Sequence, residues 1–322
     1  MTSTPPEPLP SEWADVDGSR VHYVHADGPD DGPTFVLVHG LGGSLVNWDS
    51  LVPLLTPHGE VYALDLGGFG LTEVDPAHAT VRRNQQLLDA FLKTVVGRPV
   101  VLVGNSMGGL ISATQAAREP GTVSGVVLVD AALPISPLNR PHPLVSVAFG
   151  IYAVPPLGRR FLTGRAARGT IEQQVTEVFT LVTADRRRVP RWLFERHVEA
   201  ARQHADDASS TDAFLVAARS ILLVLGRRTA YVRELGKILA PVLVVHGEKD
   251  RLVNVAAARA AVKRFPAWTY AEGAGLGHCP MFEDPQWVAD HVRAWLASHP
   301  QTTARSARYA ADPAAEPDVT TA

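Results

Sequence analysis

Short apolar runs alternate with amphipathic stretches along most of the chain. The runs are rich in β-branched residues, which is typical of strands with both faces covered, and they occupy residues 34–38, 61–65, 100–103, 125–130 and 241–245. An alternating run at 20–25 and a short one at 268–271 complete the predicted strands. The stretches between them predict helices at 46–55, 81–96, 110–118, 256–264 and 285–298. This alternation predicts an α/β fold, a mostly parallel, doubly wound sheet with helices on both faces.

The alternation of strand and helix is lost between residues 134 and 235. This segment predicts helices at 171–183, 191–203 and 211–225, and residues 144–154 are strongly apolar. Residues 151–235 contain 14 Arg and no Lys against 9 acidic residues. We therefore predict an inserted helical cap at 134–235. The core covers 15–133 and 236–299, and the polar ends, 1–14 and 300–322, are predicted to be disordered.

Composition narrows the class of protein. Of 322 residues, 46% are hydrophobic and 20% charged, as in ordinary globular proteins, and the net charge of −3 excludes a nucleic-acid footprint. The single cysteine, Cys279, is typical of a reducing compartment. The N-terminus is neither basic nor apolar, and no apolar run approaches the roughly 20 residues of a membrane span. We expect a cytoplasmic protein.

The most informative stretch lies between the predicted strand at 100–103 and the helix at 110–118. It reads Gly104-Asn105-Ser106-Met107-Gly108, a G-x-S-x-G pattern. A strand that turns this sharply into a helix leaves no room for β-carbons beside the serine, which explains the two glycines. The turn exposes the hydroxyl and directs helix amides toward it. Ser106 is the candidate nucleophile.

A serine nucleophile needs a histidine base. His278 lies in a glycine-rich loop after the last predicted strand, where it can reach back over the sheet. His39 and His246 each follow a strand and precede a glycine, and we interpret both as structural.

The base in turn needs a carboxylate to orient it. Asp250, just past the penultimate predicted strand, is the favoured acid because the order serine, acid, histidine then follows successive post-strand loops. Glu248 lies close to it, and Asp130, at the end of an earlier strand, is the main rival. For Asp130 and Asp65 we favour a structural role in binding loop amides.

An oxyanion intermediate requires two backbone donors. Met107 follows the nucleophile and supplies one amide. The loop Gly40-Leu41-Gly42-Gly43 permits close approach of the backbone, so the Leu41 amide is the second candidate.

These motifs together resemble the α/β-hydrolase family over 15–133 and 236–299. The matching segments are an oxyanion loop at 39–43, a D-x-x-G-x-G-x-S segment at 65–72 with threonine last, the elbow at 104–108, an acid loop at 247–250 and a histidine at 278. The resemblance implies a serine hydrolase fold with a cap. It does not fix the substrate, because this fold hosts many chemistries.

Details of the motifs narrow the choice within the family. Serine at 106 argues against haloalkane dehalogenases and epoxide hydrolases, which use aspartate there. Asn105 is similar to the elbow of carbon–carbon bond hydrolases that act on ring-cleavage products. Their oxyanion loop usually continues with Pro-Gly and their histidine is followed by Trp, whereas this chain has Gly43-Ser44 and Cys279. These departures favour a carboxylesterase or a lipase acting on a small or monoacyl ester.

We therefore predict acyl transfer through Ser106 to water, with a small-molecule ester as substrate and with neither a metal nor an organic cofactor. A hydrolase of carbon–carbon bonds in diketones is the alternative, followed by a perhydrolase or acyltransferase. A catalytically silent binding protein on the same fold is the alternative from another class. The oligomeric state is left open, and the arginines of the cap fit either a membrane face or a solvated helix surface.

Overall fold

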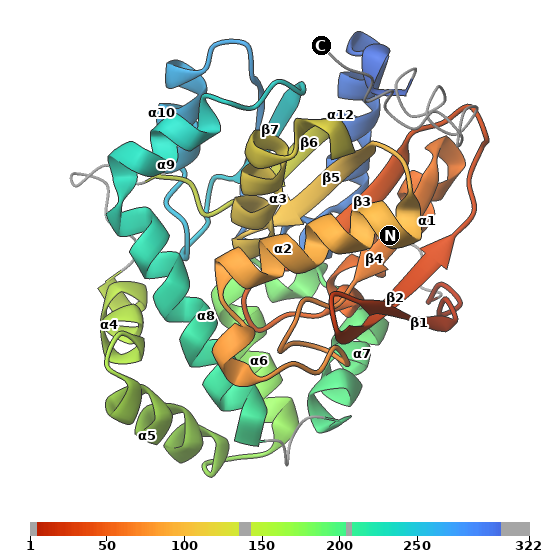
Figure 1. Ribbon diagram of the computed structural model, residues 1–322. Coiled ribbons are helices and arrows are strands. Elements are labelled where there is room, and N and C mark those ends of the chain that lie inside the picture. The colour runs from red at the N-terminus through yellow and green to blue at the C-terminus, as the bar shows by residue number, and fades with distance from the viewer. Residues whose placement is uncertain (1–4, 135–142, 204–207, 304–322) are drawn as a thin grey trace.

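The computed structural model describes residues 5–134, 143–203 and 208–303 (Figure 1). Its centre is an eight-stranded sheet in the order β1-β2-β4-β3-β5-β6-β7-β8. The strands are β1 (Ser11–Val16), β2 (Ser19–Ala26), β3 (Thr34–Val38), β4 (Glu60–Leu64), β5 (Val100–Asn105), β6 (Val123–Val129), β7 (Val242–Gly247) and β8 (Thr269–Gly273). All neighbours from β4 to β8 are parallel, and only β2 runs antiparallel to the strands beside it. The mostly parallel α/β sheet predicted from the sequence is confirmed.

Helices cover both faces of the sheet, which explains the continuous apolar runs of its strands. In β3, Val36 and Val38 face one buried cluster while Phe35 and Leu37 face the other. The first cluster includes side chains of α2 (Val81–Phe91), α3 (Met107–Arg118), α9 (Arg228–Leu235) and α10 (Ala256–Arg264). The second includes side chains of α1 (Val52–Leu55) and α12 (Pro285–Ser298). Figure 1 shows these two groups on opposite sides of the sheet.

Of the α-helices described between β6 and β7, five lie beyond one end of the sheet (Figure 1), and the last, α9, packs on the core instead. The five are α4 (Pro143–Tyr152), α5 (Pro155–Ala166), α6 (Ile171–Val182), α7 (Arg191–Gln203) and α8 (Ala208–Gly226). In the described part of the chain, α8 contains the one window, Ser209–Gly226, that is long and apolar enough to cross a membrane by length and composition alone. Only 28% of that window is buried. We refer to α4–α8 as the cap.

The chain differs from the sequence predictions at several places. Disorder is predicted over 1–14, but β1 begins at Ser11 and pairs with β2. The predicted helix at 46–55 consists of a 3-10 turn (Leu45–Trp48) and the four-residue α1, because Pro53 restarts the helix. Helix α5, which carries three arginines and a Pro-Pro start, was not predicted. Disorder is also predicted from 300, but Thr302 is buried; residues 1–4 and 304–322 lie outside the described residues.

Candidate active site

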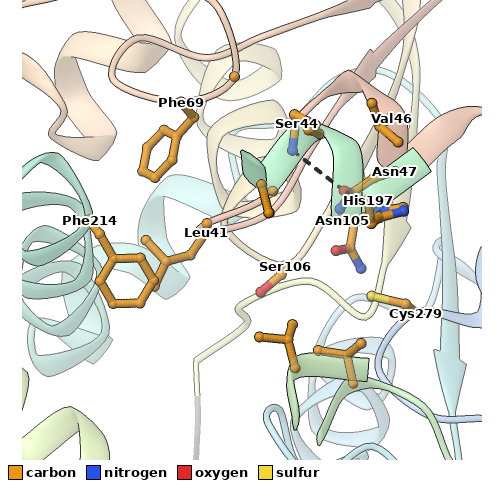
Figure 2. A pocket seen from close by; sticks show the side chains of 18 of the residues that line it. Leu41, Ser44, Val46, Asn47, Phe69, Asn105, Ser106, His197, Phe214 and Cys279 are labelled. Atoms are coloured by element: carbon orange, nitrogen blue, oxygen red, sulfur yellow. Dashed lines mark hydrogen bonds between the residues drawn. The ribbon is translucent and has the colours of Figure 1, made fainter. Parts of the chain in front are cut away.

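Ser106 occupies the tight turn that joins β5 to α3. Its backbone has φ 53° and ψ −113°, a conformation that costs energy for a residue with a β-carbon. The glycines around it are required by space: a β-carbon on Gly108 would collide with the carbonyl oxygens of Val38 and His39. One on Gly104 would lie 2.5 Å from the Gly108 oxygen. The serine is therefore held at the N-terminus of α3, with its side chain in the cavity shown in Figure 2.

His278 and Asp250 are brought together from the loops that follow β8 and β7. His278 Nδ1 lies 2.7 Å from Asp250 Oδ2, and both side chains are almost completely buried. The other carboxylate oxygen, Oδ1, accepts the amides of Leu252 at 2.7 Å and Val253 at 3.0 Å. Burial alone would raise the pKa of Asp250, but His278 and His246 beside it hold the pKa below its usual range. Asp250 is therefore an anion that can orient the imidazole.

Asp130, the rival acid, has different partners. Its Oδ1 accepts the amide of Gly247 at 2.9 Å, as expected for a structural carboxylate at a strand end. His246 lies between the two acids, with Nε2 3.6 Å from Asp130 and 3.3 Å from Asp250, and donates to the carbonyl of Val253 at 3.0 Å. Burial, followed by the negative charge of Asp250, raises the pKa of Asp130 well above its usual value. The single negative charge of this cluster therefore lies on Asp250.

The glycine loop after β3 lies directly against the elbow. A β-carbon on Gly40 would lie 3.1 Å from that of Ser106, and Gly42 has φ +70° and packs against the ring of Phe214. His39 fixes the loop, because its Nδ1 donates to the Gly40 carbonyl at 2.8 Å and its Nε2 accepts the Leu66 amide at 3.0 Å. Burial lowers the pKa of His39, which keeps the ring neutral for this role. The structural interpretation of His39 is confirmed.

Two residues that the sequence analysis did not assign tie the site together. The amide of Asn105 donates to the carbonyls of Val129 and His278, both at 3.1 Å, and so links the nucleophile turn to the histidine loop. The sequence shows that Asn105 stands beside Ser106, but no local sequence pattern indicates its contact with the distant histidine loop.

Glu283 is the second unassigned residue and is completely buried. Its Oε1 accepts the amides of Ala184 at 3.0 Å and Asp185 at 2.9 Å, and its Oε2 accepts that of Gly277 at 2.7 Å. It therefore joins the segment after α6 to the loop that carries His278. The available sequence signal was an acidic residue directly after the apolar run 279–282.

A second serine–histidine–aspartate contact exists at the edge of the sheet. His22 Nδ1 lies 2.7 Å from Asp65 Oδ2, and His22 Nε2 lies 2.9 Å from Ser11 Oγ. Asp65 also accepts the amides of Leu45 at 2.7 Å and Leu71 at 2.8 Å, which confirms the predicted structural role. Ser11 begins an edge strand, so no helix amides are directed at its hydroxyl. It provides a matched control for Ser106.

A large cavity connects the site to the cap. Its volume is about 2480 Å³, and its lining includes Ser106, His278 and Cys279 together with apolar side chains from every cap helix, among them Val145, Phe149, Phe161, Val178 and Phe214. Figure 2 shows Leu41, Phe69 and Phe214 on one side of Ser106 and Cys279 on the other. The cavity can accept an extended apolar group beside the serine hydroxyl.

Two clusters in the described residues have the geometry of metal ligands. One is Asp130, His246 and Asp250, in which Asp130 Oδ1, His246 Nε2 and both oxygens of Asp250 bind backbone groups or His278, while Asp130 Oδ2 and His246 Nδ1 have no hydrogen-bond partner in the described part of the chain. The other is His25, Asp27 and Glu60, where Glu60 also pairs with Arg98. Neither cluster needs a metal to explain its contacts.

Comparison with known proteins agrees with this architecture. The profile of the alpha/beta hydrolase family matches residues 35–291, and the chain belongs to that family. It is a hydrolase of this fold.

Two relatives and one solved structure illustrate the range of similarity. A monoacylglycerol lipase of Mycolicibacterium smegmatis is 28% identical over 305 residues, which cover 89% of this chain and 96% of the lipase. A 2-hydroxy-6-oxo-6-(2'-aminophenyl)hexa-2,4-dienoic acid hydrolase of Metapseudomonas resinovorans is 23% identical, with 92% and 93% covered. The crystal structure of a membrane phospholipase A, described as a bacterial virulence factor, superposes with a TM-score of 0.69 at 27% identity, covering 91% of this chain and 87% of that one.

Proposed function

We propose that this protein is a serine hydrolase that cleaves carboxylic esters of small or monoacyl, lipid-like substrates through an acyl-enzyme. The observation that carries the proposal is the combination of Ser106 on a strained turn with the buried His278–Asp250 pair, both opening on one apolar cavity. Strain at such a turn persists only where the surrounding structure enforces it, and here two glycines and the loop after β3 do so.

The proposed mechanism follows from the hydrogen bonds of His278. Since Asp250 is an anion that only accepts, Nδ1 of His278 must carry a hydrogen, and Nε2 is left with a lone pair. Nε2 takes the proton of Ser106 as Oγ attacks the ester carbonyl, and the protonated ring then gives that proton to the leaving alkoxide. The same ring next activates a water that releases the acid and restores Ser106.

We assign the stabilisation of the negative charge on the tetrahedral intermediate to two backbone amides, those of Leu41 and Met107. Met107 is the first residue of α3, where free N–H groups and the helix dipole favour negative charge. Leu41 follows Gly40, where an added β-carbon would lie 3.1 Å from the β-carbon of Ser106. In enzymes that catalyse related acyl transfers, removal of one such donor typically lowers kcat about 100- to 1000-fold.

A monoacyl ester suits the cavity better than a small polar one. Its lining is predominantly apolar, and Phe149, Val178 and Phe214 of the cap contribute to it. The similarity to a monoacylglycerol lipase supports this class of substrate. Cleavage of carbon–carbon bonds in ring-cleavage diketones is the second candidate, supported by Asn105 beside the nucleophile and by the similarity to a hydrolase of such a dienoic acid.

The test is the initial rate on p-nitrophenyl esters from acetyl to palmitoyl. Wild type should turn over with an optimum at a medium or long chain, Ser106→Ala should be inactive, and Ser11→Ala should match wild type. A fluorophosphonate probe should label wild type and Ser11→Ala, with the adduct on Ser106 by mass spectrometry. Labelling without turnover of any ester would overturn the esterase proposal in favour of diketone cleavage, and the absence of labelling would point to a binding protein.

A further inference from the structure

Seven of the nine large apolar side chains that are exposed in the described residues belong to the cap helices or to the two-residue link between α4 and α5. They are Val147, Val154, Leu157, Phe161, Val178, Leu181 and Leu223, with exposed fractions between 38% and 65%. A helical insertion that served only to shield the site would bury such residues, and scattered single ones would need no explanation. The concentration of these side chains on one part of the chain therefore requires an explanation.

Four of these side chains belong to the lining of the catalytic cavity. Val147, Phe161, Val178 and Leu181 are exposed to solvent and also line the cavity. The apolar lining of the site therefore continues outward onto the surface of α4, α5 and α6. We call these four residues the apolar rim.

A separate hollow of about 900 Å³ between α5 and α6 adjoins the rim. It is lined by the arginines 160, 165 and 168 and by Leu157. It shares five lining residues with the catalytic cavity, which are Ile151, Phe161, Arg165, Gln174 and Glu177. Arg165 pairs with Glu177 at 2.7 Å, and Glu177 is the one carboxylate of the lining. Arg160 and Arg168 are exposed and have no acidic partner within the described residues. The hollow thus combines an uncompensated positive charge with apolar walls.

The sequence around the hollow has the same asymmetry. Residues 155–170 contain four arginines and no acidic residue, and the remaining arginine, Arg159, binds Asp212 at 2.6 Å. Two arginines are therefore left to bind an anion from outside the chain. Guanidinium groups bind phosphate oxygens well because their donors form a planar fork.

We propose that the hollow between α5 and α6 binds the phosphate headgroup of an anionic lipid while the apolar rim enters the acyl layer, so that the cap docks on a lipid surface with the cavity entrance against it. A free phosphate ion would explain the arginines but not the apolar rim. A second protein would explain the rim but gives no reason for two unpaired arginines in a hollow. The inference rests on the proposed function only for the identity of the substrate. That substrate is a monoacyl ester, which would pass from the lipid along Phe161 into the cavity.

The test measures binding apart from catalysis. Purified protein is sedimented with sucrose-loaded vesicles of phosphatidylcholine alone or of equal parts phosphatidylcholine and phosphatidylglycerol. Wild type and Ser106→Ala should both sediment with the anionic vesicles, and binding should weaken as added salt screens the surface. Arg160→Glu with Arg168→Glu should lower the partition onto these vesicles at least about tenfold, since each basic residue near an anionic surface contributes roughly fivefold.

Matched variants separate docking from a general loss of charge or apolar surface. Leu157→Asp lies in the hollow and not in the catalytic cavity, and it should lose binding while hydrolysing p-nitrophenyl acetate at the wild-type rate. The controls Leu239→Asp and Arg264→Glu alter an exposed leucine and an exposed arginine of the core and should bind as wild type.

Three results would overturn the proposal. One is failure of wild type to sediment with anionic vesicles, and another is unchanged binding after reversal of both arginines. The third is concentration-dependent self-association that Leu157→Asp abolishes, in the absence of vesicle binding, which would make the face an interface between two copies. None of these depends on Ser106, so failure of the esterase proposal is recognised separately by the soluble-ester assay.

Discussion

Replacement of Glu283 by glutamine tests whether the cap and the histidine loop are held by one buried carboxylate. The carboxylate accepts three backbone amides and is not exposed at all. Glutamine keeps one acceptor oxygen, which can satisfy the amides of Ala184 and Asp185. Its NH2 group then faces the Gly277 amide, which is 2.7 Å from the oxygen it replaces.

The magnitude follows from these contacts. One charge-assisted hydrogen bond is lost, worth about 1.5–3 kcal/mol, and a buried donor is left without an acceptor at a cost of about 1–3 kcal/mol. We expect Glu283→Gln to lower the free energy of unfolding by about 3–5 kcal/mol, which a domain of ordinary stability survives. Activity on a soluble ester should fall through kcat more than KM, since Gly277 directly precedes His278.

Urea unfolding followed by tryptophan fluorescence and circular dichroism measures the first effect, with the slope of the transition unchanged. Glu234→Gln is the control, because this glutamate forms a partly exposed ion pair with Arg118 and should change stability by less than about 1 kcal/mol. A Glu283→Gln protein within about 1 kcal/mol of wild type would refute the reasoning.

Three further predictions address the acid, the elbow and a partly buried histidine. Asp250→Asn should lower kcat by roughly 10⁴-fold, whereas Asp130→Asn should keep most of the activity; similar losses would contradict the assignment of the charge to Asp250. Gly108→Ala should destabilise the fold by about 3 kcal/mol because its β-carbon meets a carbonyl of β3, while Gly121→Ala, which has open space, should be neutral in thermal melting. Burial lowers the pKa of His197 to about 4. Below about pH 6.5 the unfolded chain therefore binds a proton that the folded chain does not, and the free energy of unfolding decreases as the pH is lowered. His197→Gln should therefore lose about 2 kcal/mol less than wild type between pH 7 and pH 5 in urea titrations; an identical pH dependence would contradict the burial argument.

The sequence was most informative where local chemistry determines the structure. The buried strands were found because their apolar runs need cover on both faces, as the two clusters around β3 show. The elbow at Ser106 was found because only glycine fits beside it. The roles proposed for Leu41, Met107, Ser106, Asp250 and His278 remain predictions for kinetics to test.

The missed features depend on contacts between distant segments. Glu283 reads as an ordinary acidic residue until the fold places three amides around it. Strand β1 is polar and irregular in pattern, and it is recognised only by its pairing with β2. Helix α5 begins with two prolines and contains two glycines, which locally favour a loop, so tertiary context overrides its weak helix propensity.

The position of β8 has a consequence for how the enzyme fails. This strand is the last of the sheet, pairs with β7 alone and is half exposed, yet the loop that carries His278 begins at its end. Edge elements open by local fluctuation at a lower free energy than the interior strands. Amide hydrogens of Tyr270 and Ala271 should therefore exchange faster than those of Val101 and Leu102 in β5. On heating, the protein would lose the position of His278, the proposed base, while Ser106 and most of the core were still in place, and its working temperature range would be narrower than its melting temperature suggests.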